Sequence, residues 1–498
     1  MAVKNKKISN LNIGALNCHG IVDKLDYPNV IDLISQSDIF GVSETWADKK
    51  DDIKVPGFKF FPLHREGGKG PKRGGIGLFV RESLRKNVKI RYDISSENVL
   101  WCKLDKRYFG YGEDVYVGNV YFPPEYSSRE KRIKLDHFKQ LIETTTKINS
   151  KNVVLIGDFN ARTQKIKDTL NKDKHEDDTI HDFYSNISSI RNNQDKTTNN
   201  YGKKLIEYCI STRSYIANGR TLGDLQGKFT CHQSTGSSTV DYAVINEELK
   251  KHVKSFRVLD PNTGSDHCPI RLELACPHGF VVPGEGGDIT TGPPPFRWDD
   301  MTRSFFTQRI ESDSITQEIE NLNKALDSCD DVDAHVKALS KIYKGSLEGK
   351  RKNNKHRNRK RVKPKAWYDK TCHEVGKRLK LVAKSLVNTP NNPYLRGSFV
   401  KTRKDYKRLL KKKKIEWRDS MIRKIESLEE KDPKEYWKLV NELRGKKQSG
   451  SNISNAETFA KFFENLYKKH DPGGHVEKEE FVLNRLGDFD LQKELDFT

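Results

Sequence analysis

The chain has 498 residues, which is room for roughly two to four domains with a sizeable buried core. No apolar run approaches the ~18 residues needed to cross a bilayer, and no apolar core follows the basic N-terminal residues. We therefore expect neither a membrane protein nor a secreted one. The eight cysteines form no C-x-x-C pair, so we expect scattered reduced thiols rather than a zinc or redox motif.

The net charge of +22 comes from one segment of the chain. Residues 351–424 hold 27 Lys and Arg against 5 Asp and Glu, so the remainder is neutral. Such a block is typical of a protein that binds a polyanion, because each cation placed on a phosphate releases condensed counterions. A solvated charge run or a nuclear-import signal would have the same composition.

Residues 9–275 consist of short apolar runs bounded by turn residues, and many of the runs are β-branched, which favours strands. The predicted strands span 11–16, 39–42, 75–80, 115–121, 153–156, 215–217, 240–245 and 270–274, and the predicted helices span 26–36, 129–147 and 202–212. Because strands outnumber helices, we expect an α/β (α+β) fold, a four-layered αββα sandwich of two mixed sheets, rather than a barrel. The polar segment 163–200 is predicted to be a long surface loop.

Beyond residue 275 the pattern changes from strands to helices. The predicted organisation is a basic N-terminal tail (1–8), the sheet domain (9–275), a Pro/Gly linker (276–300), a helical segment (301–349), a strongly basic helical region (350–428) and a helical C-terminal segment (429–498). In the helical segment one apolar stripe recurs at helical spacing, from Val332 through Val336, Leu339 and Ile342 to Tyr343.

The basic region contains a long predicted helix over 394–428. Its apolar residues step along it by 7, 4, 7, 4 and 7 positions: Phe399, Tyr406, Leu410, Trp417, Met421 and Leu428. This heptad-like spacing indicates a packing seam rather than a ligand site.

Polar residues stand at the ends of separate apolar strands in the sheet domain. Asp158 and Asn160 follow one strand on the same side, and Asp241 lies inside an apolar strand, where it needs a donor. Each alone fits a turn or a solvated side chain. Together they match phosphodiester hydrolysis: Glu44 can hold a divalent cation, Asp158 and Asn160 can orient or deprotonate water, and His267, oriented by Asp241, can stabilise developing charge.

The motifs that carry this pattern stand in a fixed order. They are Asn17, Ser43-Glu44-Thr45-Trp46, Asn119-Val120-Tyr121, Gly157-Asp158-Phe159-Asn160, Val240-Asp241-Tyr242 and Ser265-Asp266-His267. This set resembles the endonuclease/exonuclease/phosphatase family, which includes deoxyribonuclease I and the abasic-site (AP) endonucleases. Within that family, Asn218-Gly219-Arg220-Thr221 and Gly227-Lys228-Phe229-Thr230-Cys231 resemble the endonuclease domain of non-LTR (LINE-type) retrotransposons.

The helical part resembles the segment that precedes the reverse transcriptase in such polyproteins, through residues 365–372 and 432–437. No polymerase core motif follows before Thr498. We therefore expect a fragment, a truncated element or a domesticated endonuclease that lacks the reverse transcriptase.

The resemblance implies a role for each matched position. The implied catalytic residues are Asn17, Tyr121, Asp158, Asn160, Asp241 and His267. The implied metal is Mg²⁺, with Mn²⁺ as a substitute, held by Glu44 with Asn17 and Asp266 beside it. Thr230 and Ser265 match positions that line the DNA backbone.

The implied function is a metal-dependent endonuclease that nicks duplex DNA, leaves a 3′-hydroxyl and cleaves the target site of a retrotransposon. The expected partners are duplex DNA and, through the basic region, element RNA, in the nucleus, with no membrane and no small-molecule substrate. Three alternatives stay open: an AP-site repair endonuclease, a phosphatase or sphingomyelinase on the same fold, and a catalytically silent nucleic-acid-binding protein. The sequence Cys18-His19, where several repair enzymes carry an acid two residues after the Asn, argues against the first.

Overall fold

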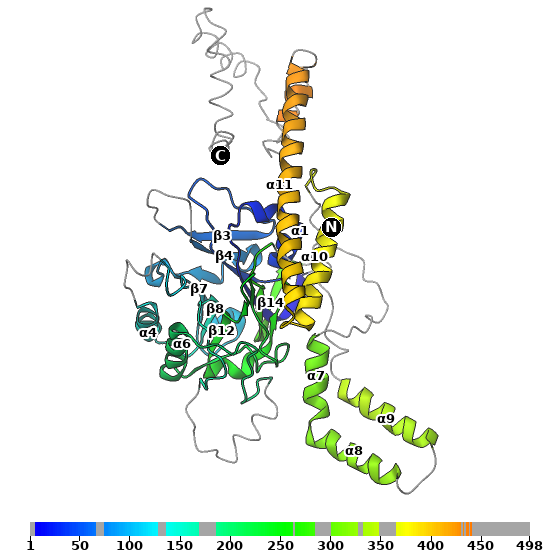
Figure 1. Ribbon diagram of the computed structural model, residues 1–498. Helices are drawn as coiled ribbons and strands as arrows, with labels where there is room; N and C mark the ends of the chain where they lie inside the picture. Colours follow the sequence, from blue (N-terminus) through cyan, green and yellow to red (C-terminus); the bar gives the residue numbers. More distant parts are fainter. Residues whose placement is uncertain are drawn as a thin grey trace, which may run out of the picture. The chain divides into compact units, whose positions relative to one another are not determined.

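Two six-stranded sheets form the centre of the computed structural model (Figure 1). The structure describes residues 5–65, 74–127, 136–168, 186–261, 264–283, 300–326, 332–347, 365–429, 432, 435–437, 439 and 440. The first sheet has the order β13 (Val253–Val258), β14 (Ile270–Pro283), β1 (Asn5–Asn17), β2 (Ile39–Ser43), β4 (Ile76–Arg81) and β3 (Phe58–Leu63). The second has the order β5 (Val88–Ile90), β6 (Val99–Leu104), β7 (Val115–Tyr121), β8 (Val153–Asp158), β12 (Asp241–Asn246) and β9 (Ser214–Ile216).

Each sheet is mixed. The pairs β1–β2 and β7–β8 are parallel, whereas the other neighbours are antiparallel. A small separate hairpin pairs β10 (Cys231–His232) with β11 (Ser237–Ser238). Because the two parallel pairs end at the same edge of the sandwich as the site described below, their carboxyl ends position its polar residues.

The core lies between the sheets, where alternate residues of both face inward. Helices cover the outer faces. Helix α1 (Pro28–Ser35) packs on the first sheet through Ile31 and Ile34, and α4 (His137–Ile148) and α6 (Asn200–Ser211) pack on the second through Leu141 and Leu205 (Figure 1). A short helix, α2 (Lys106–Phe109), follows β6. The predicted αββα sandwich is confirmed.

One buried amide ties the two sheets together. Asn119 of β7 donates from Nδ2 to the carbonyl oxygens of Val42 (3.0 Å) and Gly77 (3.2 Å) in the opposite sheet. Residue 41 has to be glycine for this contact, because a Cβ there would lie 2.3 Å from Asn119 Oδ1. The sheets are therefore held in fixed register just below the polar site.

The structure changes several predicted boundaries. Strand β14 continues to Pro283 and pairs with residues 5–8 of β1, so part of the predicted linker and part of the predicted N-terminal tail are strand. Six strands have no counterpart among the predictions: β3, β5, β6, β10, β11 and β13. Except for Asn200, where α6 begins, the described parts of the 163–200 loop contain no helix or strand, but Asp195 within it is buried against Arg162. The first residues of the helix predicted at 129–147 lie outside the described residues.

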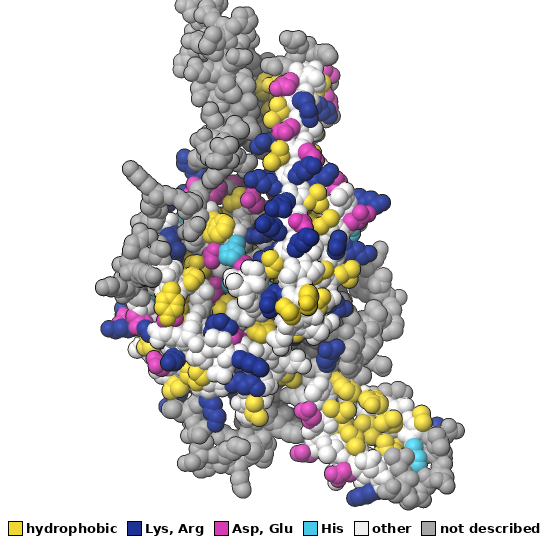
Figure 2. Space-filling model, viewed as in Figure 1, with side chains coloured by type: hydrophobic (Ala, Val, Ile, Leu, Met, Phe, Trp, Pro, Cys, Tyr) yellow, Lys and Arg dark blue, Asp and Glu magenta, His cyan; other side chains and the backbone are white. Residues whose placement is uncertain are grey.

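The helical part begins with α7 (Asp300–Ile310), α8 (Asp313–Leu326) and α9 (Val332–Leu347). Ile342 of the predicted stripe is buried, but Val336, Leu339 and Tyr343 are 55%, 44% and 47% exposed. Figure 2 shows hydrophobic side chains gathered over these helices. The predicted stripe is thus only partly a packing face.

Helices α10 (Lys370–Asn388) and α11 (Pro393–Glu429) enclose a second apolar cluster. Phe399, Tyr406 and Leu410 of α11 are buried in it, which confirms the first half of the predicted seam. The chain forms two compact units, residues 1–417 and 418–498. The predicted linker beyond 283, the basic stretch 350–364 and the C-terminal segment beyond 440 lie outside the described residues. No helix that the structure describes has the length and apolar character of a membrane span.

Candidate active site

Polar residues from four strand ends meet at one edge of the sandwich. Asn17 ends β1, and Glu44 directly follows β2, whose last residue pairs with Asn17. On the second sheet, Asp158 ends β8 and faces Asp241, the first residue of β12, as its register partner. The two sheets therefore each deliver one pair of polar residues to the same place.

Asn17 joins the two pairs. Its Nδ2 donates to Glu44 Oε1 and to Asp158 Oδ2, each at 2.9 Å, and the residue is 1% exposed. A single amide hydrogen-bonded to both carboxylates fixes their separation across the gap between the sheets. Asn17 is therefore a positioning residue for both.

His267 forms the centre of a buried charge cluster. Its Nδ1 lies 2.9 and 3.1 Å from the two Asp241 carboxylate oxygens, and its Nε2 lies 3.9 Å from Asp158 Oδ2. Burial lowers the pKa of His267, but Asp241 outweighs burial and raises it well above the usual value. Burial and the neighbouring Asp241 raise the pKa of Asp158 to about 7. An imidazolium beside a carboxyl that titrates near neutrality is suited to acid–base chemistry.

Two further carboxylates meet at His19. Its Nδ1 lies 2.7 Å from Asp266 Oδ1 and its Nε2 lies 3.3 Å from Glu44 Oε2, while its ring stacks on Trp46 at 5.7 Å. Although burial opposes protonation, Asp266 and Glu44 raise the pKa of His19 to about 9. Burial alone would raise the pKa of Asp266, yet the His19 contact holds it well below its usual range. The imidazolium of His19 thus balances these carboxylates.

Two groups of His and carboxylate ligand atoms in the described residues lie close enough together to hold a cation: His19, Asp266 and His267, and Asp158, Asp241 and His267. Glu44 belongs to neither group, but its Oε2 lies 3.3 Å from His19 Nε2, beside the first of them. Hard oxygen donors of this kind are those that Mg²⁺ and Mn²⁺ prefer. The ligating atoms of His19, Asp266 and His267 also lie within 4.8 Å of one another.

Asn160 and Tyr121 complete the polar floor. Asn160 donates from Nδ2 to the Phe122 carbonyl (2.8 Å) and to Asp158 Oδ2 (3.3 Å). Tyr121 is 5% exposed, and burial followed by Glu44 and Asp158 raises its pKa, so the phenol keeps its proton. The Arg65 guanidinium lies 5.7 Å from the Tyr121 ring. Arg65 is a cation at the site that our sequence reasoning missed, because the stretch around it has no strand or motif signal.

Thr230 and Ser265 lie in the interior. The Thr230 hydroxyl accepts from the backbone N–H groups of Val240 and Asp241, both at 3.0 Å. The Ser265 hydroxyl donates to the Asn17 carbonyl at 2.7 Å and accepts from the His267 N–H at 3.2 Å. Both residues are 0% exposed, so here they order the backbone around catalytic candidates, and contact with DNA stays a prediction.

The loops that carry the site are held in unusual conformations. His19, Glu44, Trp46 and Asn160 all have φ between 45° and 50°, a region that non-glycine residues rarely adopt. Backbone hydrogen bonds and the buried Lys24 ammonium, which binds the carbonyls of residues 18–20, hold these loops in place. Strain of this kind persists where the surroundings over-determine the backbone, and it clusters at functional sites.

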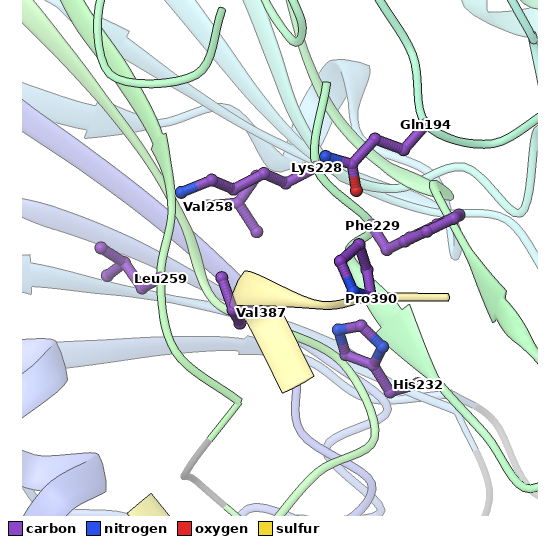
Figure 3. A pocket seen from close by; sticks show the side chains of 8 residues that line it. All are labelled: Gln194, Lys228, Phe229, His232, Val258, Leu259, Val387 and Pro390. Atoms are coloured by element: carbon purple, nitrogen blue, oxygen red, sulfur yellow. The ribbon is translucent and has the colours of Figure 1, made fainter. Parts of the chain in front are cut away.

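A small pocket lies apart from this cluster. Figure 3 shows it between the sheet domain, represented by Phe229 and His232, and the end of α10 with the turn that follows, represented by Val387 and Pro390. None of its eight lining residues belongs to the polar cluster. The candidate chemistry therefore lies at the strand ends and not in this cavity.

One family model and several solved structures are similar to about half of the chain. A family model described as Endonuclease/Exonuclease/phosphatase family matches residues 14–267. No curated protein is similar enough to count as a match. Among solved structures, the endonuclease domain of TRAS1, a telomere-specific non-LTR retrotransposon, is similar at 13% identity and TM-score 0.37, over 54% of this chain and 99% of that one. AP endonuclease LMAP from Leishmania major is similar at 14% identity and TM-score 0.41, over 54% of this chain and 89% of that one. The 3′-5′ exonuclease NExo from Neisseria meningitidis is similar at 16% identity and TM-score 0.37, over 53% of this chain and 100% of that one.

Proposed function

The chain belongs to the endonuclease/exonuclease/phosphatase family, and from this premise we propose that it is a metal-dependent endonuclease that hydrolyses phosphodiester bonds of duplex DNA and leaves a 3′-hydroxyl. The observation that carries the proposal is that His267 lies between Asp241 and Asp158, next to His19, which contacts Glu44 and Asp266. The first group would supply proton transfer and the second group a cation site, and hydrolysis of a phosphodiester needs both.

The protein's own residues divide the reaction between them. Asp158 takes a proton from water as the water oxygen bonds to phosphorus, and the bond from phosphorus to O3′ breaks. The departing O3′ takes a proton from solvent water, so the products are a 5′-phosphate and a 3′-hydroxyl. His267, held by Asp241, donates to the phosphate oxygen on which charge grows, and Asn160 fixes the same group.

Glu44 and Asp266 would hold the divalent cation, Mg²⁺ or Mn²⁺, with Asn17 orienting Glu44. When bound, such an ion neutralises phosphate oxygens and stabilises the departing alkoxide. Tyr121, protonated because of its burial, would donate to the phosphate.

The test is nicking of supercoiled plasmid by the full chain, with Mg²⁺ and with EDTA, followed by sequencing of the cut ends. Nicking should need the metal, leave 3′-hydroxyl ends, and disappear in Glu44→Gln and His267→Ala while DNA binding in EDTA is unchanged. Calorimetry should show weaker Mn²⁺ binding in Glu44→Gln but not in His267→Ala. Full nicking by both variants would refute the assignment of these residues.

Two other activities of the family compete with this proposal. Release of phosphate from soluble phosphoinositides without plasmid nicking would favour a phosphatase. Cleavage confined to duplexes that carry an abasic site would favour a repair enzyme. The same proposal includes a retrotransposon role, which the sequence motifs support. It also includes RNA binding by the basic region and action in the nucleus, which the block of 27 Lys and Arg in 351–424 supports.

A further inference from the structure

Helix α11 lies against the sheet domain through aromatic side chains. The Tyr406 ring is 6.3 Å from that of Tyr27, and the Phe399 ring is 6.1 Å from that of His232. Lys414 forms an ion pair with Asp26 at 3.2 Å. Buried aromatic contacts at two points along the helix fix which of its faces meets the domain.

This contact brings two cations beside the loop that carries Asp266. Arg403 Nη1 donates to the His232 carbonyl at 3.4 Å, and its guanidinium lies 5.4 Å from the Phe399 ring. Lys407, one helical turn further on, has its Cε 3.7 Å from the position of a Cβ on Gly264. Gly264 directly precedes Ser265-Asp266-His267, so both cations stand at the rim of the candidate active site. Arg403 is one of the charges that lower the pKa of Asp266, after the nearer histidines.

Neither cation has a carboxylate within 4.0 Å among the residues that the structure describes. Other cations of the same helix do: Arg408 is near Asp405, Lys413 near Asp369 and Lys414 near Asp26. Arg403 and Lys407 are half-buried and four residues apart, so they repel each other. Burial first, and Arg403 second, lower the pKa of Lys407. An anionic group between them would relieve this repulsion.

Figure 2 shows Lys and Arg side chains gathered along α11 on the side of the molecule in view. Several cations of this helix, such as Lys404 and Lys411, are exposed to solvent. Arg403 and Lys407 differ because packing holds them at one place, next to the loop of Asp266 and His267.

We propose that Arg403 and Lys407 of α11 bind a backbone phosphate of the DNA strand that enters the active site. The helix then forms one wall of the substrate cleft, and the basic region is part of the nuclease site rather than a separate tether. The inference rests on the proposed function for the identity of the polyanion. A guanidinium and an ammonium one turn apart supply the donors that a phosphodiester accepts.

The experiment compares Arg403→Gln and Lys407→Gln with Lys404→Gln and Lys411→Gln in the full chain. Lys404 and Lys411 are exposed on the same helix, so the control variants lose the same charge away from the site. The affinity for a fluorescent DNA duplex is measured by anisotropy in EDTA from about 50 to 200 mM KCl. Each test variant should weaken binding by about 3- to 10-fold and lower the slope of log K against log salt by about 1, as expected for one lost phosphate contact.

Further readouts separate phosphate binding from other roles. In nicking assays the test variants should raise KM with kcat within about 2-fold of the wild type, and Lys407→Arg should restore binding. If the two cations only balance Asp266, Mn²⁺ affinity will change and the salt slope will not. Salt slopes equal to those of the control variants, or a change seen with single-stranded RNA but not with duplex DNA, would overturn the inference. A wild type that binds DNA with this slope but does not nick would instead refute the proposed function.

Discussion

The buried contact between Asp241 and His267 predicts a large loss of activity in Asp241→Asn. His267 Nδ1 lies 2.9 and 3.1 Å from the two Asp241 oxygens, and the two residues are 5% and 2% exposed. Hydrogen bonds to a buried charge, together with the charge left unpaired, are worth about 2–4 kcal/mol. If His267 is charged in the transition state, this loss reduces the rate of cleavage by about 30- to 1000-fold.

The assay is single-turnover nicking of supercoiled plasmid with protein in excess, so that binding does not limit the rate. Asp168→Asn is the matched control, because Asp168 is equally buried but pairs with Arg220 outside the polar cluster. It should cost stability without changing the rate per folded molecule. An Asp241→Asn rate within about 3-fold of the wild type, or an equal loss in both variants, would refute the assigned role of Asp241.

Two further predictions concern stability. Asn119→Ala should lower the free energy of unfolding, measured in urea, by about 2–3 kcal/mol, because it leaves the carbonyls of Val42 and Gly77 without their donor. A change under about 0.5 kcal/mol would contradict the proposed link between the two sheets. Burial, followed by Arg403, lowers the pKa of His232 to about 4. The unfolded chain therefore binds more protons between about pH 6.5 and 4, and stability falls as the pH drops through that window. From pH 7.5 to 5 the loss should be about 2 kcal/mol, and His232→Gln should remove it, so an unaltered pH dependence in that variant would disprove the effect.

The strands with an uninterrupted apolar run could be predicted from the sequence. The run that precedes Asp158 is an example, since a buried strand in a parallel pair reads as a continuous apolar stretch. Strand β6 was missed although residues 99–102 form an apolar run, because that run is only four residues long and is followed by Lys103. Strand β3 was missed because it contains Pro62, and it is defined by its neighbour in the sheet rather than by its own residues.

The site could be predicted as a set of residue types but not as a geometry. Asp158 and Asp241 are register partners although 83 positions separate them, and no local pattern carries that pairing. His19 entered our sequence reasoning only as a departure from the repair enzymes, yet in the fold it contacts both Glu44 and Asp266. Arg403 could not be distinguished from the other basic residues of 351–424, because composition does not tell which helical face is buried.

The position of the site between the sheets links its geometry to the stability of the sandwich. Asn17 belongs to the first sheet and bonds to Asp158 of the second, while Asn119 bonds in the opposite direction a short way inside the core. A slide of one sheet against the other by about 1 Å would break both bonds, and hydrogen bonds weaken steeply with such a change. Glu44 has φ 50°, and the backbone of residues 44–46 bonds to the segments that follow β1 and precede β4, so loosening the clamp at Asn119 should release that strain as well. Variants of Asn119 should therefore lose cleavage activity at temperatures where they are still folded.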